Sequence, residues 1–506
     1  MGVNMTLKEN LSRYLDAGFP ILYINTFEEA KAVETIMDVA DRRTVATWSL
    51  AKGYGEYSTK SQEWLVPVSK DESSDIHVVL NTKLAFIEEL KRTILVIKDA
   101  HSILEDEQVI AGLKEISIKI SEGLDCCIIL ISSVVKIPVE LEKYITILES
   151  DYKNYDDICD IIKNFVSENA LTPLNPKLLE DMALAFKGLS EFEILNLLSL
   201  AVAEDGELTR KDLTLIFEQK KQMIMKSGIM EMIPLKEKID DIGGLENLKT
   251  WLSRKSKVFK NIKDAEAFGV DMPKGVLIAG VPGCGKSLCA KAAASLFEVP
   301  ILRLDIGKLM GKYLGESEAN LRKAINLAEA ISPCVLWVDE LEKAFAGISS
   351  NGGHEVTTRL FGTFLTWMQE KTSTTFVVAT ANDITQLPPE LLRKGRFDEI
   401  FYVGLPKAEE RRKIFEIHIS KRRKNDLKDI NLQELVSKTE GYSGADIEGV
   451  VKEGVEYAFT NDRKALTTKD IVDAIQNTNS LSVIMKESLD KMKVEYEKRK
   501  LKNASK

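Results

Sequence analysis

Cysteine, histidine and long apolar runs are all scarce in this sequence of 506 residues. Its six cysteines form no CxxC pair, and its four histidines lack the spacing of metal ligands. These absences disfavour a disulfide framework or a zinc site and favour free thiols in a reducing compartment. No stretch approaches the roughly 18 apolar residues of a membrane span, and residues 1–10 lack the apolar core of a signal peptide. We therefore expect no membrane span and a cytoplasmic location.

An excess of basic charge is also absent. The chain has 69 lysines and arginines against 78 acidic residues, a formal net charge of −9. This balance makes nucleic acid an unexpected partner. Hydrophobic residues at 44% and charged residues at 29% are ordinary values for a globular protein. At about 150 residues per domain, the length predicts roughly three domains.

A glycine-rich loop is the first feature that carries chemistry. The apolar run at 275–279 predicts a buried strand, residues 280–287 (GVPGCGKS) fit the phosphate-loop pattern, and 288–297 has a helical pattern. Glycines let consecutive backbone N–H groups turn inward around a phosphate. Lys286 would reach the β- and γ-oxygens of ATP, and the Ser287 hydroxyl would ligate Mg²⁺. The cofactor-binding residues expected here are Val281, Pro282, Gly283, Cys284, Gly285, Lys286, Ser287 and Leu288.

Two later strands end in residues that suit hydrolysis. The apolar run at 335–338 leads to Asp339 and Glu340, and the run at 376–380 leads to Asn382. We expect Asp339 to hold the metal ion and Glu340 to activate the attacking water. Asn382 would position that water or contact the γ-phosphate. The alternatives are two solvated acids at a helix start and an asparagine that caps a turn.

The first 230 residues contain similar features in the same order. Strand-like runs at 19–25, 94–99 and 127–132 correspond to the strands before the phosphate loop, before Asp339 and before Asn382. This order predicts an ancient internal duplication. The alternative is that any α/β domain supplies strands that end in an acid.

The first copy has no phosphate loop. Residues 25–29 (NTFEE) stand where the glycines should be. With an offset of 240 residues, Asp99 matches Asp339, and Ala100 then stands in the place of the second acid. We therefore expect a degenerate domain that cannot hydrolyse nucleotide and that serves a structural or substrate-handling role.

Six motifs together resemble the classical AAA ATPase module over about residues 235–480. They are DDIGG at 240–244, GVPGCGKS at 280–287, DE at 339–340, ATAN at 379–382, LRKGRFD at 392–398 and GYSGAD at 441–446. The stretches 361–372 and 387–405 resemble, more narrowly, the AAA-domain family encoded in algal plastid genomes and found in cyanobacteria and other bacteria. That family has an N-terminal region of similar size, so the resemblance extends over nearly all of the chain.

The resemblance implies roles for residues outside the phosphate loop. Arg393 and Arg396 resemble arginine fingers, which reach the nucleotide of a neighbouring subunit and offset charge on its γ-phosphoryl group. From their spacing alone, the two could equally be surface arginines at the end of a helix. The backbone of Asp241, Ile242 and Gly243 would line the adenine pocket.

The resemblance also implies a pore loop made by Lys312, Tyr313 and Leu314. In the family this loop faces the centre of a ring, and its aromatic residue grips an unfolded polypeptide. The structural alternative is that Tyr313 simply packs under the loop.

The expected fold is α/β: a P-loop NTPase parallel sheet with a C-terminal helical lid, preceded by a degenerate AAA-like α/β domain. The expected function is Mg²⁺-dependent ATP hydrolysis by a homo-hexameric ring that remodels or threads a protein substrate. The alternative is a nucleotide-gated scaffold or regulatory switch. The expected segments are 1–155 (N-terminal α/β domain), 156–230 (helical), 235–406 (ATPase core), 407–480 (lid) and 481–506 (a charged, solvated helical tail).

Overall fold

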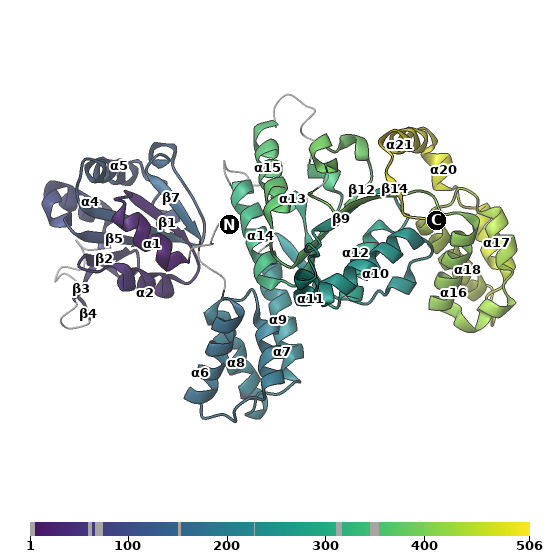
Figure 1. The fold of residues 1–506 in the computed structure, drawn as a ribbon, viewed down its shortest axis with the longest axis horizontal. Coiled ribbons are helices and arrows are strands. Elements are labelled where there is room, and N and C mark those ends of the chain that lie inside the picture. The colour runs from purple at the N-terminus through teal and green to yellow at the C-terminus, as the bar shows by residue number, and fades with distance from the viewer. Residues whose placement is uncertain are drawn as a thin grey trace. The chain divides into compact units, whose positions relative to one another are not determined.

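The computed structural model describes residues 6–58, 63–65, 74–149, 153–226, 228–309, 316–344, 354–393 and 395–506. The chain divides into two compact units (Figure 1), Met1–Lys153 with Ser190–Asn196, and Asn154–Leu189 with Leu197–Lys506. Each unit contains a seven-stranded sheet. Among the described residues, every helix is too short or too polar to span a lipid bilayer.

The first unit is a three-layer α/β domain with strand order β4-β3-β2-β5-β6-β1-β7. Helices α1 and α2 pack on one face of the sheet, and α4 and α5 pack on the other. Because both faces are covered, the central strands are continuous apolar runs, and every residue of β6 is buried. The strands are β1 (Ile21–Asn25), β2 (Thr44–Ser49), β3 (Gly53–Ser58), β4 (Glu63–Leu65), β5 (Thr93–Lys98), β6 (Cys126–Ser132) and β7 (Ile145–Glu149). The helices are α1 (Leu7–Asp16), α2 (Glu29–Val39), α4 (Ile76–Ala85) and α5 (Glu107–Ser121).

A group of four helices follows the first sheet in the chain. They are α6 (Tyr155–Glu168), α7 (Pro176–Phe186), α8 (Glu191–Asp205) and α9 (Asp212–Lys226). Lys220 of α9 is almost fully buried, and its ammonium donates a 2.8 Å hydrogen bond to the carbonyl of Ala185 near the end of α7. This bond satisfies a helix-end carbonyl that would otherwise lack a partner.

The second unit has strand order β14-β13-β9-β12-β11-β10-β8, in which only β8 is antiparallel to its neighbour. The strands are β8 (Met230–Ile233), β9 (Gly275–Gly280), β10 (Ile301–Leu304), β11 (Cys334–Val338), β12 (Thr375–Ala381), β13 (Glu399–Val403) and β14 (Lys502–Asn503). The helices before the lid are α10 (Glu246–Lys260), α11 (Ile262–Ala267), α12 (Lys286–Phe297), α13 (Ile306–Leu309), α14 (Glu316–Ile331) and α15 (His354–Glu370). The lid helices are α16 (Ala408–Arg423), α17 (Leu432–Lys438), α18 (Gly444–Thr460) and α19 (Thr468–Gln476), and α20 (Leu481–Ile484) and α21 (Lys486–Arg499) follow them.

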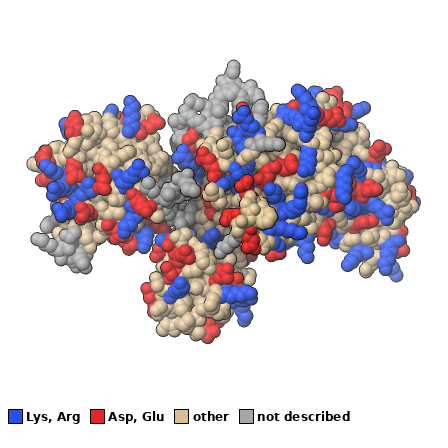
Figure 2. Space-filling model, in the orientation of Figure 1, with Lys and Arg blue, Asp and Glu red and all other residues tan. Residues whose placement is uncertain are grey.

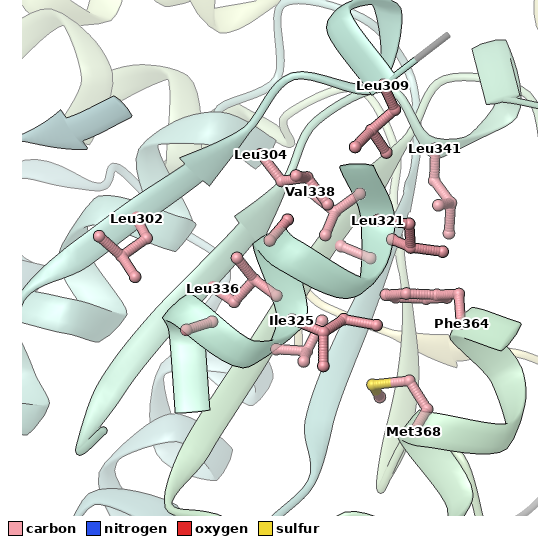
Figure 3. Packing of buried hydrophobic residues seen from close by; sticks show 14 of the residues in the cluster. Leu302, Leu304, Leu309, Leu321, Ile325, Leu336, Val338, Leu341, Phe364 and Met368 are labelled. Carbon is pink, nitrogen blue, oxygen red and sulfur yellow. The ribbon is translucent and has the colours of Figure 1, made fainter. Parts of the chain in front are cut away.

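Two apolar cores hold the second sheet between its helices. On one face, leucines of β10 and β11 pack against α14 and α15, where Ile325, Phe364 and Met368 close the cluster (Figure 3). On the other face, α10 and α12 pack through aromatic rings, with Phe297 4.9 Å from Phe376 between ring centroids. The two cores fix the carboxyl ends of β9, β11 and β12 side by side, and this is the edge at which ligands of parallel sheets bind.

The two units share one strand order, which supports the predicted duplication. Numbered along each chain segment, the five central parallel strands lie in the order fifth, first, fourth, third, second in both sheets. These are β7-β1-β6-β5-β2 in the first unit and β13-β9-β12-β11-β10 in the second. Each set is followed along the chain by four helices, α6–α9 and α16–α19.

The register of the two sheets corrects the predicted offset by one residue. Thr93 of β5 pairs with the first residue of β6, and Cys334 of β11 pairs with the first residue of β12. Counting from these positions, Lys98 occupies the place of Asp339, and Asp99 occupies the place of Glu340. Asp99 and Glu340 also share a left-handed backbone, with φ of 49° and 52°. The expectation that Ala100 replaces the second acid is therefore wrong, because the second acid is retained as Asp99 and a lysine stands in the place of the first acid.

The phosphate loop of the second unit has a shorter counterpart in the first. Three residues, Thr26–Glu28, connect β1 to α2, whereas five residues, Val281–Gly285, connect β9 to α12. The short connection contains no glycine. This geometry agrees with the expected loss of the loop.

The last residues of the chain differ from the expected solvated tail. Helix α21 is exposed, but β14 adds a parallel strand to β13, and Ala504 is fully buried. The Ala504 carbonyl accepts hydrogen bonds from the backbone N–H groups of Asn247 and Leu248, at 3.0 and 3.2 Å. The Tyr496 ring stacks on Tyr402 of β13, with 4.0 Å between centroids. The charge pattern predicted the helix correctly but missed the docked strand after it.

Acidic and basic side chains are interspersed over the visible face of both units (Figure 2). All six cysteines are free thiols, and only Cys284 is partly exposed.

Candidate nucleotide site

The phosphate loop lies between β9 and α12 in a backbone conformation that requires glycine. Gly280 has φ of 142°, and a Cβ atom there would lie 2.1 Å from the carbonyl oxygen of Val403. Gly283 has φ of 72°, and its carbonyl accepts a 2.9 Å hydrogen bond from the Ala445 N–H at the start of lid helix α18. The loop is thereby held between the neighbouring strand β13 and the lid.

Lys286 is the first residue of α12 and is buried, with 6% of its surface exposed. Its ammonium donates hydrogen bonds of 2.8 Å to the carbonyls of Gly280 and Val281. Burial lowers its pKa to about 8, although Cys284 and two nearby carboxylates act in the opposite direction. The side chain therefore lies folded over the loop, from which it can turn to a bound phosphate.

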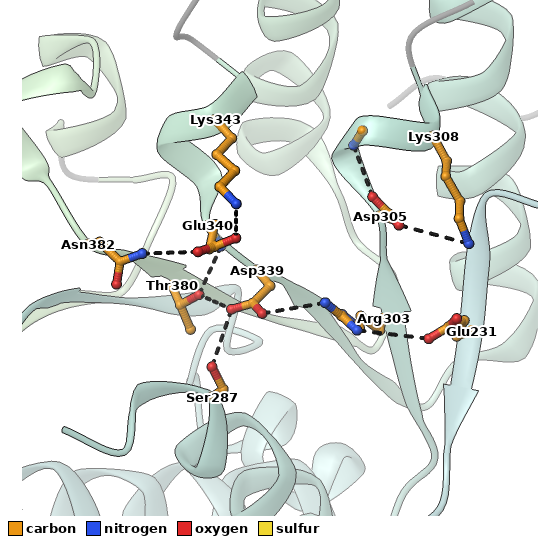
Figure 4. Close-up of polar contacts among 11 residues, drawn as sticks. Glu231, Ser287, Arg303, Asp305, Lys308, Asp339, Glu340, Lys343, Thr380 and Asn382 are labelled. Atoms are coloured by element: carbon orange, nitrogen blue, oxygen red, sulfur yellow. Dashed lines mark hydrogen bonds and ion pairs between the residues drawn. The ribbon is translucent and has the colours of Figure 1, made fainter. Parts of the chain in front are cut away.

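Asp339 follows β11 and is held by side chains on three other elements (Figure 4). Its Oδ1 accepts hydrogen bonds from the Thr380 hydroxyl at 2.6 Å and from the Ser287 hydroxyl at 3.3 Å. Its Oδ2 lies 3.7 Å from a guanidinium nitrogen of Arg303. The sequence predicted correctly that Ser287 and Asp339 lie close together. It did not predict the contacts of Thr380 and Arg303 with Asp339.

Glu340 is held by contacts on both of its carboxylate oxygens. Asn382 donates a 3.2 Å hydrogen bond to Oε1, and the Lys343 ammonium lies 2.5 Å from Oε2 (Figure 4). The Glu340 backbone N–H donates to the Thr380 hydroxyl at 3.1 Å. Thr380 thus connects both acids, and Asn382 touches the expected base directly.

A pocket of about 480 Å³ joins these residues to the lid. It is lined by residues from three places: the segment before α10, the phosphate loop with the strand ends, and the lid helices. The predicted residues that line it are Asp241, Ile242, Gly243, Pro282, Gly283, Cys284, Gly285, Lys286, Ser287, Leu288, Asp339, Glu340 and Asn382. Val281 does not line the pocket, because its side chain is buried and its backbone bonds to Val403 and Lys286.

The lid contributes pocket residues that the sequence reasoning missed. Ile414, Ile417 and His418 of α16 face the pocket, as do Ala445 and Glu448 of α18. Their signal in the sequence is weak, since Ile414, Ile417 and His418 show only the i, i+3, i+4 spacing of a helix face. The buried Nδ1 of His418 has no hydrogen-bond partner among the described residues and lies 4.0 Å from a Glu448 oxygen. Burial lowers the pKa of His418.

These features fit a nucleoside triphosphate with Mg²⁺. The loop offers backbone N–H groups and an ammonium for phosphates. The Ser287 hydroxyl and Asp339 carboxylate are the hard oxygen donors that Mg²⁺ prefers. His418 and Ile417 line the lid side of the pocket.

Known proteins match this chain over nearly all of its length. Family profiles match the N-terminal domain (7–150) and the second domain (156–227) of SpoVK-like AAA ATPases, the ATPase family associated with various cellular activities, AAA (276–405), and the AAA+ lid domain (429–473). The AAA domain-containing protein ycf46 of Guillardia theta is 36% identical over 497 residues, 96% of this chain and 94% of the relative. The ycf46 protein of Pyropia yezoensis is 35% identical over 510 residues, 99% of this chain and 100% of the relative. The chain belongs to the ycf46 family of AAA ATPases.

Other AAA proteins match about half of this chain. A cell division cycle protein 48 homolog of Archaeoglobus fulgidus is 33% identical over 261 residues, which is 50% of this chain and 34% of the relative. The ycf46 relatives, by contrast, also match the first half. The resemblance predicted from the six motifs is therefore confirmed, and membership of the AAA family implies nucleotide binding.

Two further groups of residues were predicted for this AAA chain, a pair of arginines and a pore loop. Arg393 is exposed, and Arg396 is half-buried and donates a hydrogen bond to the carbonyl of Glu390. Neither arginine lines the pocket of its own chain. Their role in a neighbouring subunit stays a prediction. Lys312, Tyr313 and Leu314 lie outside the described residues, so the pore loop also stays a prediction.

Proposed function

We propose that this AAA ATPase hydrolyses Mg²⁺-bound ATP in a closed homo-hexameric ring and uses the cycle to remodel or thread a protein substrate. The observation that carries the proposal is the joined network of Ser287, Asp339, Glu340 and Asn382 around one pocket. Mg²⁺, when bound, neutralises charge on the β- and γ-phosphates.

Each residue of this network has a separate task in the proposed reaction. Lys286 holds the γ-phosphate, and Ser287 with Asp339 would hold the metal ion. Glu340 accepts a proton from the attacking water, and Asn382 fixes the carboxylate through its 3.2 Å hydrogen bond. The lid closes the base side of the pocket and reduces access of bulk water.

Glu340→Gln tests the assignment of the base. The substitution keeps the shape and the hydrogen bond to Asn382 but removes the basic oxygen. We expect phosphate release to fall by roughly 10²-fold or more, with ATP affinity unchanged. Asp383→Asn, at a half-buried acid on the loop after β12, is the control and should hydrolyse normally. Equal rates in wild type and Glu340→Gln would contradict the assignment.

The same variant tests the proposed work on a protein. A ring that binds ATP without hydrolysing it should retain its substrate, which can be recovered with the ring and identified by mass spectrometry. Assembly that follows ATP binding, with no protein retained and no remodelling activity, would contradict threading and favour a nucleotide-gated scaffold.

Mixed rings test whether Arg396 acts on a neighbouring subunit. Lys286→Ala subunits cannot hold ATP but carry the arginine, whereas Arg396→Ala subunits bind ATP but lack it. Each variant alone should be inactive. Mixing them should restore measurable hydrolysis, because an intact pocket then meets an intact arginine across a subunit boundary. No recovery in rings shown to contain both variants would contradict action in trans.

A further inference from the structure

Three charged side chains form a row that ends on the predicted metal ligand. Arg303 of β10 pairs in register with Glu231 of β8 on one side and with Trp337 of β11 on the other. The three residues therefore share one face of the sheet. The guanidinium lies 5.1 Å from the Trp337 ring centroid and also contacts Asp339, which stands two residues after Trp337 and directly follows β11. Figure 4 shows this row from Glu231 through Arg303 to Asp339.

The two oxygens of Asp339 have different partners. Oδ1 is engaged by Ser287 and Thr380. Among the described residues, Arg303 is the side chain that contacts Oδ2, at 3.7 Å. Arg303 does not line the pocket, and it contacts the Asp339 oxygen that Ser287 does not. A guanidinium in this position binds the same carboxylate oxygen that a metal ion would bind. Its positive charge also repels a divalent cation beside it.

Glu231 shares the same guanidinium. Its carboxylate lies 4.0 Å from the other terminal nitrogen of Arg303. Glu231 lies on β8, which follows helix α9 of the helical segment along the chain and pairs with β10 at the edge of the sheet. Both ion pairs are partly exposed, with 41% of the Arg303 side chain accessible. Each pair therefore contributes little to stability, and the guanidinium can shift between the two carboxylates.

We propose that Arg303 is a positioning residue that lowers the Mg²⁺ affinity of Asp339 by competing for Oδ2, and that Glu231 relieves this competition by holding Arg303 toward β8. The proposal rests on the proposed metal-binding role of Asp339. It adds that Glu231, on the strand after the helical segment, would modulate the Mg²⁺ affinity of the site.

The test measures Mg²⁺ dependence of nucleotide binding without turnover. Fluorescent ADP is bound to the full chain in EDTA and then at increasing Mg²⁺, and the Mg²⁺ concentration for half-maximal change is recorded. Arg303→Met keeps the apolar stem over Trp337 and removes the charge. We expect it to lower that concentration about two- to fivefold, and Arg303→Lys to stay closer to wild type.

We expect Glu231→Gln to have the opposite effect on the Mg²⁺ concentration for half-maximal change. With its anion removed, Arg303 turns fully to Asp339, and the required Mg²⁺ concentration rises about twofold. The double variant Arg303→Met/Glu231→Gln should match Arg303→Met alone, because Glu231 acts through Arg303. Affinity for ADP in EDTA should be equal in all variants. Lys308→Met, which breaks the separate Lys308–Asp305 pair drawn in Figure 4, is the control and should change nothing.

The outcomes separate this proposal from the one on which it rests. If Asp339→Asn leaves the Mg²⁺ dependence intact, the metal role of Asp339 fails and the role of Arg303 fails with it. If Asp339→Asn abolishes the dependence but Arg303→Met weakens Mg²⁺ binding or leaves it unchanged, only the role of Arg303 is overturned. If Glu231→Gln changes the Mg²⁺ dependence equally in wild type and in Arg303→Met, then Glu231 acts on the metal ion through its own charge. That result would overturn the proposal that Glu231 acts through Arg303.

Discussion

Lys286 has an environment that makes nucleotide binding sensitive to pH. Burial among loop carbonyls lowers its pKa to about 8 in the free protein. Bound phosphates favour the charged ammonium and therefore raise the pKa again. Binding is then strongest while Lys286 is already protonated, below pH 8. Above pH 8 the free protein loses the proton, and affinity falls by up to about tenfold per pH unit until the pKa of the bound state is reached.

Equilibrium titration with fluorescent ADP from pH 7 to pH 9.5 measures this effect. Lys286→Arg is the matched control, because a guanidinium stays charged over the whole range. Its affinity should be lower than that of wild type but flat above pH 8. A similar fall in both proteins would show that the pH dependence has another origin.

Single residues of the site differ in how well the sequence predicted them. Lys286, Ser287, Asp339 and Glu340 stand in short motifs whose spacing implies their chemistry, and they line one pocket. Thr380 lies within an apolar strand, and its contact with both acids depends on how β12 pairs with β11. Pairing of that kind is set by the folded sheet, so no local pattern could show it.

Strand β14 is the element whose contribution can be tested most directly. Ala504 is fully buried next to β13 and bonds to the start of α10. Ala504→Asp would place a charge where water cannot reach it, which is strongly unfavourable. We expect β14 to detach from the sheet edge while the apolar cores remain folded.

Hydrogen exchange followed by mass spectrometry can show this detachment. Exchange should increase by at least tenfold over residues 500–506 and at the N–H groups of Asn247 and Leu248, and it should stay unchanged in β9 and β11. Asn503→Asp is the matched control, since that side chain is exposed and retains the oxygen that accepts from Ser505. Unchanged exchange in Ala504→Asp would contradict the docking.

The type of each element was easier to predict than the residue-by-residue correspondence between the two halves of the chain. Apolar runs bounded by turns predicted β1, β5 and β6, and all three exist within one or two residues of the expected ends. The offset between the two halves was wrong by one residue, because both copies carry an acid after the strand. Only the ladder register, with the shared left-handed backbone of Asp99 and Glu340, shows which acids correspond.

At the scale of the whole molecule, the two units should differ in nucleotide binding. The first unit lacks a phosphate loop, and Lys98 stands in the place of Asp339, the proposed metal ligand. We therefore expect one nucleotide per chain in isothermal titration calorimetry at saturating Mg²⁺. Lys286→Ala should bind none, because it disables the second unit alone. A stoichiometry of two, or residual binding by Lys286→Ala at the first unit, would contradict this expectation.

The chain leaves the sheet after β13, forms the lid with α20 and α21, and returns to the same edge at β14, so both ends of this helical segment are attached to adjacent strands of one sheet. A body attached at one point can turn about three axes, whereas a body attached at two points turns mainly about the line that joins them. We therefore expect docking of β14 to restrict rotation of the lid mainly to one axis. The phosphate loop contacts α18 through the hydrogen bond between Ala445 and Gly283, so we expect a change at this loop to turn the lid about that single axis.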